Sequence, residues 1–135
     1  RIQNAKTLEK AYWILKNNKK KAKTALNEWL EKKQKVNIFG AGSVGVECFQ
    51  FLKEMDVSIE CFWDNDEAKY QTMFLGKPVL KCIEKERTKN YIVVAVMNYQ
   101  EEIVQQLEAM GYQRKEDFCL YSDIIENVYM QIEHM

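Results

Sequence analysis

The sequence has little of what marks several common protein classes. Its 135 residues include one proline and one histidine, and its four cysteines form no C-x-x-C pair, so we expect no metal site. No apolar run approaches the roughly 20 residues that span a bilayer, and no signal peptide is visible. Basic and acidic residues number 20 each, which argues against a nucleic-acid partner held mainly by charge. The composition therefore predicts one ordinary globular domain with no membrane span and no nucleic-acid partner.

The cysteines and the first residue add two further expectations. Three of the four cysteines lie in apolar helix or strand contexts, where a free thiol behaves as a small buried hydrophobe. Free thiols are typical of a reducing compartment, which predicts a cytoplasmic protein. The chain begins with Arg1 rather than methionine, so we expect a fragment of a longer protein.

The most informative stretch is a glycine-rich turn between an apolar run and an amphipathic segment. Gly40, Gly42 and Gly45 fill the pattern G-x-G-x-x-G, and Asp64 follows 19 residues after Gly45. Such a turn brings the amides at the start of a helix close to a diphosphate, and an acid after the second strand can accept hydrogen bonds from ribose hydroxyls. The pattern predicts a Rossmann-type nucleotide site.

The rest of the chain supplies the elements of a parallel sheet. Residues 36–39, 57–63, 79–80, 91–96 and 118–121 have strand patterns, with helical patterns at 43–55, 81–87, 99–110 and 123–132. We predict an α/β, Rossmann-like parallel sheet of about five strands in the order 3-2-1-4-5, with helices on both faces. Residues 1–35 are predicted to form one or two helices that precede the nucleotide-binding domain, 36–135.

The predicted strand order places one group of residues in a crevice at the carboxyl ends of the strands, where such sheets bind ligands. Asn98 is also predicted to cap the helix that follows it, with Glu101 completing a capping box. The candidate cofactor-binding residues are Gly40, Gly42, Ser43, Val44, Gly45, Asp64, Asn65 and Asn98. The candidate cofactor is NAD or a nucleotide-sugar, and Asp64 would repel the 2′-phosphate of NADP.

Four runs of sequence, IFGAGSVG, CFWDNDEAK, LGKPVL and YIVVAVMNYQEEIVQQLEAMGY, together resemble a known kind of domain. They are similar to the Rossmann-type domain of bacterial polysaccharide-biosynthesis proteins. Examples are the N-terminal domains of sialic-acid-type sugar O-acyltransferases and of nucleotide-sugar epimerase/dehydratases, and related domains accompany sugar-modifying methyltransferases and glycosyltransferases. The resemblance covers about residues 36–121. It implies that Gly40, Gly42, Ser43 and Gly45 hold phosphate and that Asp64 and Asn65 hold the nucleoside, and it supplies no catalytic residue.

Three functions remain open at this point. The first, which the motifs favour, is a module that binds a nucleotide-containing small molecule beside a neighbouring catalytic domain. The second is an interaction domain with a vestigial pocket, which could form a homodimer. The third is an autonomous NAD-dependent nucleotide-sugar oxidoreductase, for which Tyr99 and Tyr121 are the candidate proton donors. Whether the chain alone is an enzyme stays undecided, and the absence of an evident catalytic group argues against it.

Overall fold

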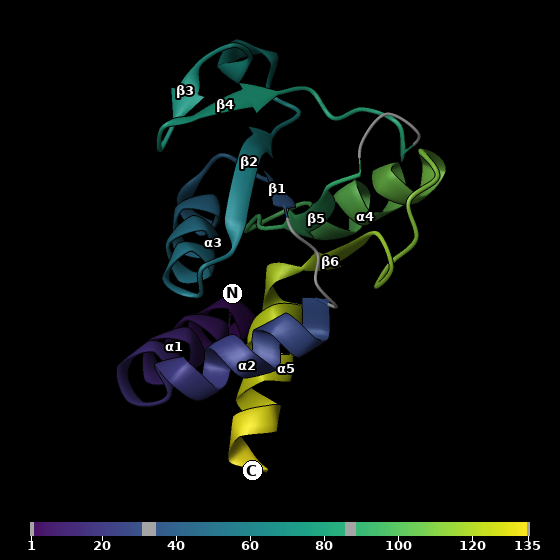
Figure 1. Cartoon of the computed structure of the whole chain (residues 1–135). Coiled ribbons are helices and arrows are strands. Elements are labelled where there is room, and N and C mark those ends of the chain that lie inside the picture. The colour runs from purple at the N-terminus through teal and green to yellow at the C-terminus, as the bar shows by residue number, and fades with distance from the viewer. Residues whose placement is uncertain (1, 31–34, 86–88, 135) are drawn as a thin grey trace.

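The computed structural model describes residues 2–30, 35–85 and 89–134. In these ranges the chain forms an α/β fold with five α-helices and a six-stranded sheet (Figure 1). The helices are α1 (Ile2–Asn17), α2 (Lys19–Leu30), α3 (Ser43–Glu54), α4 (Gln100–Ala109) and α5 (Tyr121–Glu133), with a short 3-10 helix η1 (Glu67–Lys69). The strands are β1 (Lys35–Phe39), β2 (Ser58–Trp63), β3 (Met73–Phe74), β4 (Lys77–Leu80), β5 (Tyr91–Val94) and β6 (Phe118–Leu120). None of these described helices is long and apolar enough to cross a membrane.

The sheet confirms the α/β class and corrects two details of the prediction. Its order is β3-β4-β2-β1-β5-β6, and β3 pairs with β4 in the antiparallel direction while the other neighbours are parallel. The sheet is therefore mixed rather than purely parallel, and its strand order differs from the prediction because a sixth strand, β3, is added beside β4; the five predicted strands keep their relative order. The physical reason is a tight turn at Leu75 and Gly76, both with positive φ, which folds residues 73–74 back onto β4.

Two expectations for the middle of the chain also change. The strand pattern at 79–80 stands at the edge of the predicted strand order, but in the structure β3 covers β4, and Pro78 pairs with Met73 there. A helix was expected over 81–87. Residues 81–84 are irregular in the structure, and 86–88 lie outside the described residues.

The N-terminal segment, predicted to form one or two helices, forms two, α1 and α2. The carbonyl of Asn18 accepts a hydrogen bond from the amide of Ala22 (2.9 Å), so the second helix begins directly after the first ends. The lysines that follow are partly paired: Lys19 bonds to Glu54, and Lys23 lies 2.8 Å from Asp56. Both pairs join α2 to the end of α3 at the surface, and the main packing of α1 and α2 is against α5.

The two faces of the sheet are covered unequally. One face packs against α1, α2, α3 and α5, in a core that includes Ile14, Leu26, Ile38, Leu52 and Val128, each fully buried. The other face packs mainly against α4, in a smaller core around Trp63, Val94, Leu107 and Phe118. Side chains alternate between the faces along β5 and β6. In β5, for example, Tyr91 and Val93 belong to the larger core, and Ile92 and Val94 to the smaller one. Because both faces are buried, the carboxyl ends of the strands remain as the natural place for a site.

Candidate functional site

The glycine turn follows β1 and leads directly into α3. At Gly40 φ is +128°, and a Cβ atom would lie 2.3 Å from the carbonyl oxygen of Ala95. At Gly45 a Cβ atom would lie 2.0 Å from the carbonyl oxygen of Gly40. At Gly42 a Cβ atom would meet nothing within 4 Å. The fold therefore requires glycine at the first and third positions of the motif, and it leaves open space at the second.

The first turn of α3 offers backbone donors to this space. Gly42 is the residue before the helix, and no side chain makes a capping hydrogen bond there. The first amides of a helix have no partner inside the helix, and the helix dipole favours negative charge at this end. Ser43 and Val44 both line the open pocket in front of the turn. This arrangement can hold a phosphate group without any charged side chain.

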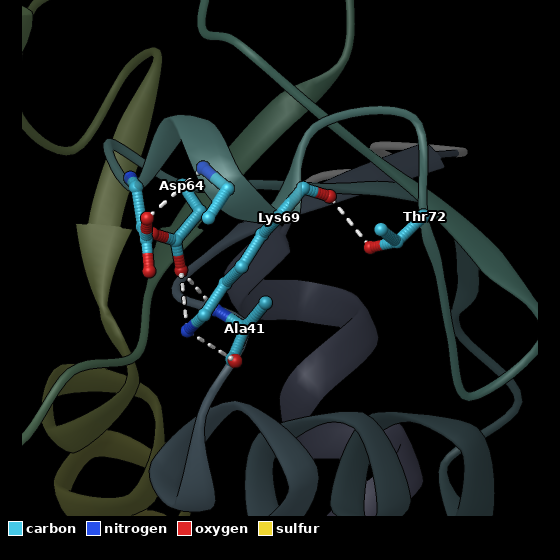
Figure 2. Close-up of polar contacts among 6 residues, drawn as sticks. Ala41, Asp64, Lys69 and Thr72 are labelled. Carbon is cyan, nitrogen blue, oxygen red and sulfur yellow. Dashed lines mark hydrogen bonds and ion pairs between the residues drawn. The ribbon is translucent and has the colours of Figure 1, made fainter.

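Asp64, at the end of β2, bonds to the glycine turn itself (Figure 2). Its Oδ2 accepts a hydrogen bond from the amide of Ala41 at 2.9 Å, and its Oδ1 accepts one from the amide of Asp66 at 2.8 Å. Lys69 Nζ donates to the carbonyl oxygen of Ala41 at 3.0 Å and lies 3.5 Å from Asp64 Oδ2. Asp64 and Lys69 thus hold the N–H and the C=O of one turn residue.

These contacts change what can be expected of Asp64. Its side chain is only 16% exposed, and each of its oxygens already accepts one backbone hydrogen bond. A carboxylate oxygen can accept a second hydrogen bond, so a ribose hydroxyl can still be bound. The positive charge of Lys69, however, offsets the negative charge of Asp64. The expectation that Asp64 alone would repel a 2′-phosphate therefore loses its basis.

The pocket in front of the turn has a volume of about 550 Å³, within the range usual for small-molecule sites. It lies at the carboxyl ends of β2, β1 and β5. Its lining residues are Phe39, Gly40, Ala41, Gly42, Ser43, Val44, Asp64, Asn65, Lys69, Ala95, Val96, Met97, Asn98, Tyr99, Glu102 and Ile103. Every predicted site residue is on this wall except Gly45, which is buried behind it because it packs against Gly40 and Phe62.

The β5 side of the pocket differs from the prediction at one residue. Asn98 lines the pocket but is not the cap of α4; Tyr99 holds that position, in a left-handed conformation (φ 62°, ψ 24°), with no side-chain cap. Across the pocket, the Asn65 amide exchanges two hydrogen bonds with Gln106 of α4, at 2.8 and 3.1 Å. Asn65 thus ties the end of β2 to α4.

A small cavity lies behind the pocket wall. Its volume is about 30 Å³, enough for one water molecule, and it shares Val44, Ala95 and Val96 with the larger pocket. Glu47 and Tyr121 face it. The Tyr121 hydroxyl is buried and has no hydrogen-bond partner that meets normal geometry among the described residues. Burial raises the pKa of Glu47, and the nearby Tyr121 hydroxyl lowers it in part.

A larger groove, of about 1150 Å³, lies between α2 and α5 at the amino end of β5. It includes Leu30, the last described residue of α2. Arg114 and Asp123 in this groove pair with each other at 3.2 Å, and Gln131 bonds to Asn127 at 2.7 Å. Asp117 and Glu126 pair with Lys85 and Lys10, at 3.0 and 2.7 Å. Several charged groups of the groove are thus already paired, and the pocket at the glycine turn remains the stronger candidate site.

Sequence reasoning missed Lys69. The residue lies in a polar stretch, five positions after Asp64, and no motif marks it. It reaches the site because η1 turns the chain back: Asp66 Oδ1 caps η1 by accepting from the amide of Ala68 (3.0 Å), and Thr72 Oγ1 donates to the Lys69 carbonyl at 2.5 Å. Asp66, followed two residues later by Ala68, is an Asx-turn signal that could have placed this bend, though not the lysine contact.

No curated protein matches the chain. One similar solved structure is the crystal structure of RSP, a Rex-family repressor, with a TM-score of 0.47 and 14% sequence identity. The similarity covers 78% of this chain and 61% of that one, so this chain spans less than two thirds of that protein's length. The prediction of no nucleic-acid partner is corrected here, because it rested on a zero net charge, which does not exclude such a partner.

The match to a protein family corrects the predicted resemblance. The matching protein family is described as "C2185-like, N-terminal", and the match covers residues 32–117. The resemblance to polysaccharide-biosynthesis domains is therefore wrong, and neither comparison supports a polysaccharide or glycosyltransferase role. The glycine turn and the acidic end of β2 are common to many nucleotide-binding folds, which is why they could not identify the family. The match spans more than half of the sequence, from the residues before β1 to those just before β6, and the chain belongs to the C2185-like N-terminal domain family.

Proposed function

We propose that this chain is a binding module for a nucleotide-containing small molecule that carries a diphosphate, with NAD as the first candidate. The observation that carries the proposal is the contrast among the three glycines. Gly40 and Gly45 are required by the fold, whereas a Cβ atom at Gly42 would meet nothing within 4 Å. The space in front of Gly42 is the space in which a diphosphate would approach the first amides of α3.

The surroundings of this space support the same ligand. The carboxylate of Asp64 is fixed by two backbone amides and retains acceptor capacity for ribose hydroxyls. The pocket volume of about 550 Å³ suits a ligand of this size. The candidate ligand-binding residues are Gly40, Gly42, Ser43, Val44, Gly45, Asp64, Asn65 and Asn98. In this proposal the domain predicted over 36–135 holds the ligand, and the preceding helices α1 and α2 form an extension that packs on α5.

The test is thermal unfolding of the full chain with a panel of ligands. The panel contains NAD, NADH, NADP, ADP, a UDP-sugar, coenzyme A and S-adenosylmethionine, each at millimolar concentration. NADP belongs in it because Lys69 offsets the charge of Asp64. A ligand at about 100 times its Kd adds about 2.7 kcal/mol of stability, which corresponds to roughly 8 °C in Tm for a domain of this size.

The variant Gly42→Ala is the matched control for that experiment. Its added methyl group meets no protein atom within 4 Å, so the unliganded protein should unfold at the wild-type temperature. The same methyl group should obstruct the diphosphate, and the ligand-induced shift should be lost. If no member of the panel shifts the Tm of the wild-type protein, the pocket is scaffold, and the remaining function is that of an interaction domain.

A further inference from the structure

One residue on the pocket wall is explained neither by packing nor by backbone preference. Tyr99 is 73% exposed and lies at φ 62° in the left-handed region. A left-handed conformation costs a residue with a Cβ roughly 1–2 kcal/mol, and bulky residues adopt it rarely. Of the described non-glycine residues with positive φ, Tyr99 alone lines the pocket. Glycine would fill the position without strain, so the tyrosine side chain itself calls for an explanation.

A second exposed apolar side chain lies beside it. Met97 is 52% exposed and lines the same pocket. Large apolar side chains of a small domain normally gain stability by burial, and these two gain little. Together they form an apolar lip on the β5 side of the pocket. The β2 side presents Asp64 and Lys69 instead.

The strand order places these features in a row. Strands β2, β1 and β5 are neighbours in parallel register. Adjacent strands are about 4.8 Å apart, so their three carboxyl ends span roughly 10 Å. Asp64 follows β2, the glycine turn follows β1, and Met97 and Tyr99 follow β5. A ligand that lies across the pocket would meet a hydrogen-bond acceptor, then an anion site, then an aromatic surface.

We propose that Tyr99, supported by Met97, is the surface on which a second planar ring of the ligand stacks. This inference rests on the proposed function and narrows it. The ligand class is a dinucleotide, in which the diphosphate joins the ribose near Asp64 to another ring-bearing group. A nucleotide that ends in a phosphate or in a sugar would leave the aromatic lip unused. Stacking of a planar ring on an aromatic side chain gives the exposed tyrosine its role.

The test measures three ligands by isothermal titration calorimetry in the full chain. NAD, ADP-ribose and ADP share the same diphosphate, and only NAD carries a second planar ring, the nicotinamide. Wild-type protein should bind NAD roughly tenfold more tightly than ADP-ribose. Tyr99→Gly should remove this difference, should leave the affinities for ADP-ribose and ADP within twofold, and should not lower the Tm, because glycine accepts a positive φ. Tyr99→Phe, which keeps the ring, should behave as wild type.

Tyr12→Ala serves as the matched control, because Tyr12 is 67% exposed on α1 and is not among the lining residues of the pocket. It should leave all three affinities unchanged. The inference is overturned if wild-type protein binds NAD and ADP-ribose equally, or if Tyr99→Gly weakens all three ligands to the same degree. If none of NAD, ADP-ribose and ADP binds, the proposed NAD site fails and this inference falls with it. If ADP binds and Tyr99 has no effect, only this inference fails.

Discussion

The two sides of the pocket differ in how their groups are supported. On the β2 side, Asp64 and Lys69 hold the backbone of Ala41 through hydrogen bonds of 2.9 and 3.0 Å, and Asn65 is bonded to α4. On the β5 side, Tyr99 is exposed and strained, and Met97 is half exposed. The β2 side thus contributes to the stability of the fold, and the β5 side costs stability. A pocket wall that only stabilised the fold would not need an exposed tyrosine in a strained backbone conformation.

This difference distinguishes two kinds of pocket residue. Substitutions on the β2 side should change stability and ligand affinity together, because the same contacts serve both. Substitutions on the β5 side should change affinity while leaving stability equal or higher. Measuring both quantities for each variant therefore distinguishes the two sides.

The largest expected effect is that of Gly45→Ala. The new Cβ atom would lie 2.0 Å from the backbone oxygen of Gly40, and neither group is the end of a flexible side chain. Relief requires the turn and α3 to move apart, which should cost about 3 kcal/mol or more of unfolding free energy. Urea denaturation measures it. A variant as stable as the wild type would show that the close packing of the turn on α3 is not required.

Asp64→Ala should have the next largest effect. It leaves the amides of Ala41 and Asp66 without their acceptor and Lys69 without its ion-pair partner, so it should cost about 2 kcal/mol. Lys69→Met should cost less than about 1 kcal/mol, because the Lys69 side chain is 40% exposed and its ion pair is screened. Both losses are measured by urea denaturation. Equal losses of unfolding free energy for Asp64→Ala and Lys69→Met would contradict the larger role given to Asp64.

Tyr99→Gly should act in the opposite direction. Removal of the strained side chain should raise the free energy of unfolding by about 0.5–1 kcal/mol, since glycine adopts a positive φ at no steric cost but loses more chain entropy on folding. Urea denaturation of the unliganded protein measures the gain. A clear loss of stability would mean that Tyr99 contributes to packing, and the contrast between the two sides would disappear.

The smallest effect concerns Glu47, in the cavity behind the wall that the two sides share. Burial raises the pKa of the Glu47 carboxyl in the folded state above its ordinary value of 4.5, so the folded protein binds a proton more tightly than the unfolded chain. The resulting stability is fully present below pH 4.5 and is lost as the pH rises through the folded pKa. Glu47→Gln should flatten the wild-type decline in this window, as measured by thermal unfolding in a pH series. An unchanged pH dependence of Tm in Glu47→Gln would contradict the raised pKa of Glu47.

The sequence allowed the local features of the site to be predicted. The glycine pattern placed the turn between β1 and α3, and the acid after β2 fell on the pocket wall with Asn65 and Asn98. These features depend on hydrophobic periodicity and on glycines that the backbone requires. The mixed sheet was not predicted, because β3 has only two residues and its pairing depends on the turn at Leu75 and Gly76.

The contacts that define the two sides could not be read from local patterns. Lys69 reaches Ala41 across 28 positions of sequence through the bend at η1. Preferences for helix caps favour Asn98 over Tyr99, and the structure reverses that choice at the cost of backbone strain. Such departures from local preference are expected where a site, rather than the fold, selects the residue.

The most direct test of the account is the affinity of Gly42→Ala for NAD, measured by isothermal titration calorimetry beside its Tm. Because the added methyl group meets no protein atom within 4 Å, the account predicts an unchanged Tm and at least a tenfold loss of affinity relative to the wild type. An affinity equal to that of the wild type, at an equal Tm, would contradict the central claim that a diphosphate occupies the space in front of Gly42.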